Sequence, residues 1–324
     1  MVIEVRGVNK SYLKGGRRTQ YSFIDIFKRR FNQKGYFHAL NDVSFDVREG
    51  EVFSLLGRNG AGKTTMIKIL SGLLLKDSGS ARVYGYDVDK DMEEIKRLLG
   101  AVIVRIKNSS SSVEKDLLNY ALLYGINGNQ AKERVEELID VFDLESVRRN
   151  STVTLSTGYN QRLKLAKSII HKPKVLLLDE PTIGLDPKIQ LELWSKILKL
   201  KKEYGMTILL TTHYMQEVER YADRVAFLKQ GVLSNVDTVS NFKNSLRKKG
   251  FRIRIDSSKN DFLKSMLKDE GYDVLRLNGK LFVEVRDYSH IVRVLRNVQA
   301  SNVLLHSFEV LEPSMEDVFI NYLK

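Results

Sequence analysis

Residues 57–65 read GRNGAGKTT, and the residues just before them, EVFSLL at 51–56, form the kind of apolar run expected of a buried strand. The stretch matches G-x-x-x-x-G-K-[ST], a glycine-rich turn that joins a strand to a helix and points backbone N–H groups at bound phosphates. Apolar residues at 66, 67, 69 and 70 give the following segment a helical stripe. Strand, turn and helix together predict a P-loop in an α/β fold.

Each residue type in this loop suits phosphate binding. Glycine lets the backbone approach oxygen atoms closely, Lys63 is expected to reach the β- and γ-phosphates, and Thr64 can offer its hydroxyl to Mg²⁺. The alternative, a glycine turn that only caps a helix, does not use the preceding strand. The predicted nucleotide-binding residues are Gly57, Arg58, Asn59, Gly60, Ala61, Gly62, Lys63, Thr64 and Thr65.

A second apolar run, residues 175–178, ends in two carboxylates, Asp179 and Glu180. Such a run is typical of a central parallel strand whose carboxyl end faces a nucleotide. Asp179 is then a candidate for the Mg²⁺ shell, and Glu180 is a candidate for orienting and deprotonating the attacking water. The alternative is a polar strand end facing solvent. Together with Lys63, these residues predict ATP hydrolysis.

At this point the sequence resembles the ATP-binding cassette (ABC) ATPases, over most of its first 232 residues. The segment LSTGYNQR is similar to the family's signature motif, which begins LSGGQ, and it departs from that pattern at Thr157 and Tyr159. The resemblance implies that the motif contacts the γ-phosphate of a nucleotide held by a second cassette. Ser156 taken alone is also a plausible helix N-cap. The motif residues are Leu155, Ser156, Thr157 and Gly158.

Two more segments resemble the family. GLDP at residues 184–187 is similar to the D-loop, which places Asp186 at the contact between two cassettes. TILLTTHYMQEVE is similar to a buried strand followed by the switch histidine, His213. A neutral imidazole there can hold the γ-phosphate and the attacking water in line. The resemblance therefore adds His213 to Lys63 and Glu180 as a catalytic residue.

The resemblance also assigns an adenine-stacking aromatic residue and a metal-contacting glutamine. Tyr12 is the best match for the aromatic residue, with Tyr36 or Phe37 as alternatives. The glutamine position is occupied by Arg105, whose guanidinium cannot accept from a metal-bound water. Mg²⁺ is therefore expected on Thr64 and the shell of Asp179, with Arg105 turned toward a phosphate or a carboxylate.

Composition limits the remaining possibilities. The chain has 324 residues, a net charge of +13 and no cysteine, which excludes disulfides, thiolate catalysis and cysteine-ligated metals. No run approaches the roughly 18 apolar residues of a membrane-spanning helix, so a soluble or peripheral protein is expected. Between residues 14 and 37, basic residues surround an apolar stripe at helical spacing. A helix on an anionic membrane and a helix packed on the cassette both fit this pattern.

The predicted organisation has two domains. Residues 1–232 form an ABC cassette, with a RecA-like core, an antiparallel β layer and a helical lobe at about 91–170. Residues 233–324 follow the order β-α-β-β-α-β, which predicts a small ferredoxin-like α+β domain. The ending PSMEDVF resembles the C-terminal domain of ABC-2 export ATPases.

The expected function is ATP hydrolysis by the nucleotide-binding subunit of an ABC-2 type exporter. The resemblance implies a homodimer, or a heterodimer with a related cassette, that encloses two ATP molecules and drives a separate membrane permease. The protein is then cytoplasmic and peripheral on the inner face of the cell membrane. The alternative is a soluble ABC ATPase that acts on ribosomes or DNA. The paired cassettes or coiled-coil insertions of those proteins are missing, which disfavours a nucleic-acid partner.

Overall fold

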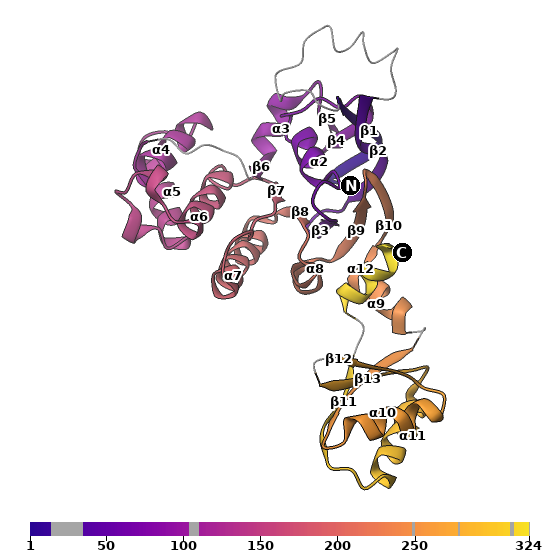
Figure 1. Cartoon of the computed structure of the whole chain (residues 1–324). Helices are drawn as coiled ribbons and strands as arrows, with labels where there is room; N and C mark the ends of the chain where they lie inside the picture. The colour runs from indigo at the N-terminus through magenta and orange to yellow at the C-terminus, as the bar shows by residue number, and fades with distance from the viewer. Residues whose placement is uncertain (14–34, 104–109, 248–249, 278, 312–313, 324) are drawn as a thin grey trace. The chain divides into compact units, whose positions relative to one another are not determined.

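The computed structural model describes residues 1–13, 35–103, 110–247, 250–277, 279–311 and 314–323 (Figure 1). Contacts divide the chain into two units, Met1–Val236 and Asp237–Lys324. The buried apolar residues of the β-α-β-β-α-β segment form a cluster separate from those of the first unit. Each unit therefore has a core of its own, as expected of a domain.

The first unit contains a six-stranded sheet in the order β10-β9-β3-β8-β7-β6. Strands β6, β7, β8, β3 and β9 run parallel, and every residue of β3, β7 and β8 is buried. A sheet covered on both faces gives continuous apolar runs, as the sequence predicted. The strands are β3 (Val52–Leu56), β6 (Leu99–Val102), β7 (Val175–Asp179), β8 (Thr207–Thr212), β9 (Arg224–Lys229) and β10 (Val232–Thr238).

Helices follow the strands at the edge where their carboxyl ends meet. Helix α2 (Lys63–Leu70) comes after β3 and packs on β7 and β8, with its expected apolar stripe buried. Helix α7 (Pro187–Tyr204) precedes β8, and α8 (Met215–Tyr221) follows it. Among the residues that the structure describes, no helix has both the length and the apolar character needed to cross a membrane.

A second, four-stranded sheet supplies the expected antiparallel layer, in the order β2-β1-β4-β5. Its strands are β1 (Ile3–Leu13), β2 (Tyr36–Val47), β4 (Ser78–Val83) and β5 (Tyr86–Asp87). Its buried residues share one core with α2 and the parallel sheet. Strands β1 and β2 pair up to Leu13 and Tyr36. Residues 14–34, which hold most of the basic amphipathic segment, lie outside the described residues.

The helical lobe consists of α4 (Val113–Leu123), α5 (Gly128–Val141) and α6 (Thr157–Ser168), which lie to one side of the parallel sheet (Figure 1). It starts later than residue 91. Helix α3 (Met92–Leu98) puts Ile95 into the core shared by the two sheets, and β6 pairs with β7. Both elements therefore belong to the core of the cassette.

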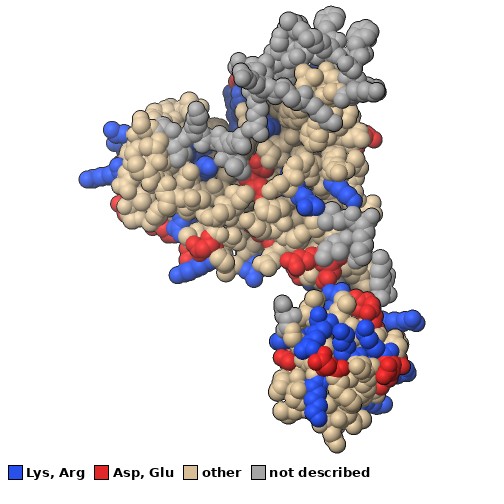
Figure 2. All heavy atoms as spheres, viewed as in Figure 1, with Lys and Arg blue, Asp and Glu red and all other residues tan. Residues whose placement is uncertain are grey.

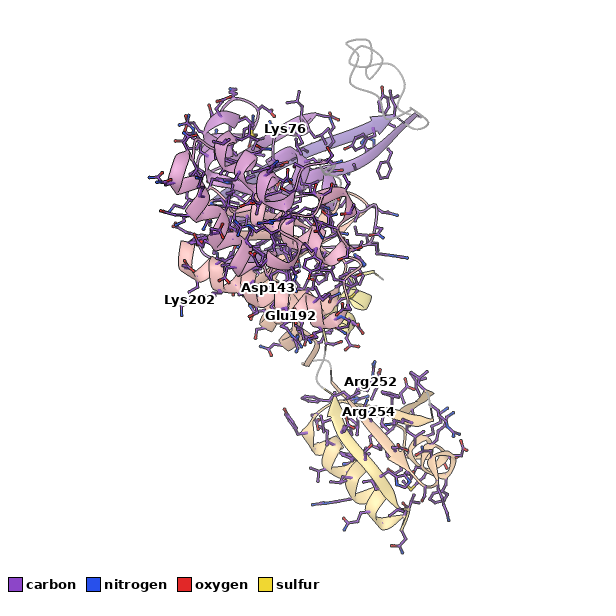
Figure 3. The ribbon with its side chains drawn as sticks, turned by 90° about the vertical axis from the view of Figure 1, so that its left-hand side faces the viewer. Lys76, Asp143, Glu192, Lys202, Arg252 and Arg254 are labelled. Carbon is purple, nitrogen blue, oxygen red and sulfur yellow. The ribbon has the colours of Figure 1, made fainter. Side chains whose placement is uncertain are left out.

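Charged side chains connect the lobe to α7. Arg162 of α6 donates to Asp143 at 2.5 Å and to Glu192 of α7 at 3.0 Å, and Lys196 of α7 also pairs with Asp143 at 2.9 Å. Asp143 and Glu192 are labelled beside α7 in Figure 3. The connection joins the two helices that follow the predicted signature motif and the predicted D-loop.

The second unit confirms the ferredoxin-like fold. Its sheet has the order β12-β13-β11-β14, all antiparallel, and α10 and α11 pack against it. Two more helices flank this motif and contact each other, α9 (Val239–Arg247) and α12 (Met315–Leu323). The remaining elements are β11 (Phe251–Ser257), α10 (Asn260–Asp269), β12 (Asp273–Leu277), β13 (Lys280–Val285), α11 (Tyr288–Ala300) and β14 (Leu305–Leu311).

Alternation along β11 explains which face of this sheet is covered. Ile253 and Ile255 are buried in the core, whereas Arg252 and Arg254 alternate with them and are labelled in Figure 3. Figure 2 shows basic side chains gathered over this unit. Arg252 bonds to Glu284, and Arg254 bonds to a glutamate of β14. The basic residues are thus partly neutralised across the strands.

Candidate functional site

The P-loop lies between β3 and α2, where its glycines are required by the backbone. Gly62 has φ = +111°, and a Cβ there would lie 2.3 Å from the carbonyl oxygen of Ala39. A Cβ on Gly57 would lie 2.4 Å from the carbonyl oxygen of Leu228. No other residue fits either position without a shift of the backbone. The glycine spacing in the sequence therefore reflects a steric requirement of this turn.

Lys63 is buried and bonded within the loop. Its Nζ donates to the carbonyl oxygen of Gly57 at 2.6 Å and to that of Arg58 at 3.3 Å, and it lies 3.0 Å from Oε1 of Glu180. A buried ammonium group next to backbone N–H groups at a helix start favours anions. The loop is therefore arranged to receive a phosphate.

Asp179 lies at the end of β7, 1% exposed. The Thr64 hydroxyl is 3.0 Å from both of its carboxylate oxygens, and the Thr211 hydroxyl donates to Oδ1 at 2.7 Å. Burial raises the pKa of Asp179, and the hydrogen bonds from Thr211 and Thr64 oppose that rise. The structure thus brings the two predicted metal-binding residues together. Thr211 was not predicted as part of the site. The signal for it in the sequence is its position at the end of the apolar strand 207–212, close to His213.

Glu180 adopts a left-handed backbone conformation, with φ = +50°. This bend follows the strand directly, and the N–H of Glu180 donates to the carbonyl oxygen of Thr211 at 2.9 Å. Its side chain lies between two partners. Oε1 faces Lys63, and Oε2 is 2.6 Å from Nδ1 of His213. The three predicted catalytic residues therefore meet at one carboxylate, although Lys63 begins α2, Glu180 follows β7 and His213 follows β8.

Tyr12, the predicted adenine-stacking residue, lies at the edge of this site. Its hydroxyl is 3.5 Å from Oγ1 of Thr65, and the side chain is 36% exposed. Phe37 pairs with Tyr12 across β1 and β2 and is also exposed. The contact with Thr65 favours Tyr12 over Tyr36 or Phe37 as the residue that faces the nucleotide. Arg105 lies outside the described residues.

The signature motif begins helix α6. The Ser156 side chain accepts from the N–H of Tyr159 at 3.5 Å, so it caps this helix. The motif lies beside the D-loop, since a Cβ on Gly158 would be 3.6 Å from Ile189 and one on Gly184 would be 3.8 Å from Thr157. Ser156 and Thr157 are exposed. These two residues of the motif are therefore accessible on the surface of the chain.

Asp186 of the D-loop caps α7. Its Oδ1 accepts from the N–H groups of Lys188 and Ile189, both at 3.1 Å. Pro187 occupies the first turn, a position that suits proline because no N–H is needed there. The exposed Asp186 is thus fixed at the start of the helix next to the signature motif.

Comparison with known proteins identifies the family of this chain. Residues 40–183 match the ABC transporter family, and residues 238–323 match the C-terminal domain of DrrA1-3-like ATP-binding proteins. The linearmycin resistance ATP-binding protein LnrL of Bacillus subtilis is 30% identical over 86% of this chain and 91% of its own length. The daunorubicin/doxorubicin resistance ATP-binding protein DrrA of Streptomyces peucetius is 32% identical over 87% of each chain.

The solved structures agree on the fold. A dimeric post-hydrolysis structure of the ATP-binding cassette MJ0796, bound to ADP and phosphate, covers 73% of this chain and 98% of its own, with a TM-score of 0.62 and 22% identity. The chain therefore belongs to the ATP-binding proteins of ABC transporters. It is an ATPase of the ABC-2 type.

Proposed function

We propose that Glu180 is the general base of ATP hydrolysis, that Lys63 binds the phosphates, and that His213 orients the Glu180 carboxylate. The position of the Glu180 carboxylate between Lys63 and His213 carries this proposal. Glu180 accepts a proton from water while the water oxygen bonds to the γ-phosphorus and the bond to ADP breaks. Lys63 stabilises charge on the phosphate oxygens, and His213 holds the carboxylate in place.

Thr64 and Asp179 fit a Mg²⁺ ion. Both supply oxygen atoms, which this hard cation prefers, and Asp179 faces the hydroxyl groups of Thr64 and Thr211. Among the described residues, no three histidine or acidic side chains form a metal-binding group. The protein would therefore supply Thr64 and the Asp179 shell, while phosphates and water supply the other ligands. Bound Mg²⁺ would neutralise charge on the transferring phosphate.

The active form is proposed to be a dimer. The signature residues, Leu155, Ser156, Thr157 and Gly158, would complete the site of a second chain, and Ser156 and Thr157 are exposed. The dimeric structure of the MJ0796 cassette supports this arrangement. Asp186, fixed beside the signature motif, would lie at the same contact. Both sites of a homodimer would be complete because one chain carries Lys63, Glu180 and His213.

Transport is proposed to occur through a separate membrane permease that places this chain at the inner face of the cell membrane. The resistance proteins that it resembles, for linearmycin and for daunorubicin and doxorubicin, support a role in the export of a compound to which the cell becomes resistant. They give no support to the alternative function on ribosomes or DNA.

Glu180→Gln tests the catalytic proposal. The amide keeps the shape of the side chain but cannot act as a base, so ATP binding should stay within about threefold while turnover falls at least about 100-fold. Glu203→Gln, at an exposed position of α7, is the matched control and should change neither quantity. Equal turnover by Glu180→Gln and the unmodified protein would remove Glu180 from the mechanism.

A further inference from the structure

Glu217 of α8 is a buried carboxylate to which no role has been given so far. It is 5% exposed, and it accepts three hydrogen bonds from residues of different elements. The donors are the Thr182 hydroxyl at 2.5 Å and Trp194 Nε1 at 3.0 Å, both to Oε1, and the Thr212 hydroxyl at 2.6 Å, to Oε2. A carboxylate is costly to bury unless its oxygens are bonded in this way.

One of these bonds fixes the turn that carries His213. The Thr212 hydroxyl donates to Glu217 and accepts from the N–H of Tyr214 at 3.0 Å. The residues on both sides of His213 are therefore held by one hydroxyl. The Tyr214 ring lies against the imidazole, with ring centroids 4.1 Å apart. This arrangement directs Nδ1 of His213 toward Glu180.

A second bond fixes the loop that carries Glu180. Thr182 is fully buried two residues after Glu180, and its hydroxyl is committed to Glu217. Its carbonyl oxygen accepts from the N–H of Leu185 at 3.1 Å, in the turn that leads to Asp186. Because Glu180 has a strained backbone, the surrounding bonds must hold it in that conformation.

The third bond reaches the helix that follows the D-loop. Trp194 lies in α7, whose first residues are capped by Asp186, and its ring stacks on Tyr221 with centroids 4.4 Å apart. Trp194 is fully buried, so its N–H needs a partner inside the protein. Glu217 is that partner. Rotation of α7 would stretch this bond.

We propose that Glu217 is a positioning residue that links the Glu180 loop, the His213 turn and helix α7, so that the state of the bound nucleotide is transmitted to the D-loop. The proposal rests on the catalytic roles of Glu180 and His213 given above. A buried network in which every oxygen is bonded tolerates few alternative arrangements, so the three elements move together. Thr182, Trp194 and Thr212 are the other members of this network, which we call the Glu217 network.

Glu217→Gln in the full chain tests the proposal. The amide nitrogen cannot accept a hydrogen bond, so at least one of the donors loses its acceptor. We expect kcat for ATP hydrolysis to fall at least about tenfold, a barrier change of roughly 1.4 kcal/mol, with the Kd of a fluorescent ATP analogue changed by less than about threefold. Glu219→Gln, an exposed carboxylate on the same helix, is the control and should behave like the unmodified protein.

The fluorescence emission of Trp194 reports on this network alone, because Trp194 is the only tryptophan in the chain. A purely structural role of Glu217 would not change how this emission responds to ATP. ATP added with Mg²⁺ should shift its emission in the unmodified protein and in Glu180→Gln. The shift should be lost in Glu217→Gln at saturating ATP. A shift of normal size in Glu217→Gln, together with normal kcat, would overturn the proposal.

Two milder variants test the proposal if Glu217→Gln lacks a cooperative unfolding transition and is therefore not properly folded. Trp194→Phe keeps a ring on Tyr221 but removes the N–H, and Thr182→Val removes one hydroxyl. Each should lower kcat by about threefold or more while the Kd for ATP stays unchanged. Folded variants with normal kcat would overturn the proposal. Normal turnover by Glu180→Gln would instead show that the catalytic assignment has failed.

Discussion

At the scale of single residues, the position of Glu180 is set by groups that lie far apart in the sequence. Lys63 precedes it by more than a hundred residues and His213 follows it, yet both contact its carboxylate. The local sequence accounts for the turn of the P-loop, because the φ of Gly62 and the close approach at Gly57 require glycine. The P-loop could therefore be predicted from the spacing of its glycines alone.

A different histidine should control the acid sensitivity of the first unit. His171 stacks on Tyr124 with centroids 3.8 Å apart, and its Nε2–H donates to the carbonyl oxygen of Leu99 at 3.2 Å. Burial lowers its pKa from 6.5 to about 4. The neutral ring therefore stabilises the fold fully above pH 6.5, and this contribution is lost as the pH falls toward 4.

His171→Phe keeps a ring on Tyr124 and removes the titration. Between pH 7 and pH 4.5, the unmodified chain should lose about 2 to 3 kcal/mol more unfolding free energy than the variant. Urea unfolding at both pH values measures this difference, with the exposed His306→Phe as the control. Equal losses in all three proteins would show that His171 is not responsible.

Glu217 shows why part of the site could not be predicted from the sequence. In the segment MQEVERY it looks like a polar residue on the solvated face of a short helix, and Thr182 and Trp194 lie in other segments. Their contact depends on how α7, α8 and β7 pack. By contrast, the ends of β7 and β8 were predictable because parallel strands place their carboxyl ends at one edge.

At the scale of elements, the pattern of apolar residues predicted the helices of the lobe but misjudged where the lobe begins. Residues 91–103 contain a helix and a strand, and only packing shows that Ile95 belongs to the shared core of the two sheets. In the second unit, the alternation along β11 and the order β-α-β-β-α-β were sufficient. The spacing of apolar residues predicts a helix or a strand, but it does not predict which element packs against its apolar face.

A buried side chain of α5, Arg134, bonds to the residues that follow α6. Arg134 of α5 is 6% exposed, and it donates to the carbonyl oxygens of Ile169 and Ile170 at 2.6 Å and 2.9 Å. It also donates to the Tyr204 hydroxyl, at the end of α7, at 2.7 Å. These carbonyl groups belong to the two residues that follow α6, where carbonyl groups lack partners within the helix, and that of Ile169 also accepts from the N–H of Lys172 at 3.0 Å. Arg134 therefore connects three helices.

Arg134→Met should destabilise the first unit by about 3 kcal/mol, because the carbonyl oxygen of Ile170 and the hydroxyl of Tyr204 lose the guanidinium donor, and the carbonyl oxygen of Ile169 keeps only the N–H of Lys172. Lys132→Met, an exposed position on the same helix, should change stability by less than about 0.5 kcal/mol. Urea unfolding measures both variants. A loss below about 1 kcal/mol for Arg134→Met would show that water replaces the guanidinium at these carbonyl groups.

At the scale of the whole molecule, one chain carries both a P-loop and a signature motif, and we propose that it needs a second copy to bring the two motifs to one nucleotide. Within the described residues, Lys63 and Thr64 bond to the P-loop, Asp179 and Glu180, whereas Ser156 and Thr157 of the signature motif are exposed. Lys63 and Ser156 of one chain are therefore proposed to contact different nucleotides.

Mixing two inactive variants tests this claim directly. Lys63→Ala loses the phosphate-binding ammonium group, and Ser156→Arg blocks the signature motif with a bulky side chain, so neither protein alone should hydrolyse ATP. In an equal mixture, half of the dimers pair the two variants, and each such dimer has one intact site. ATPase activity should then return to about a quarter of the rate of the unmodified protein. A mixture as inactive as its components would contradict an active site shared between two chains.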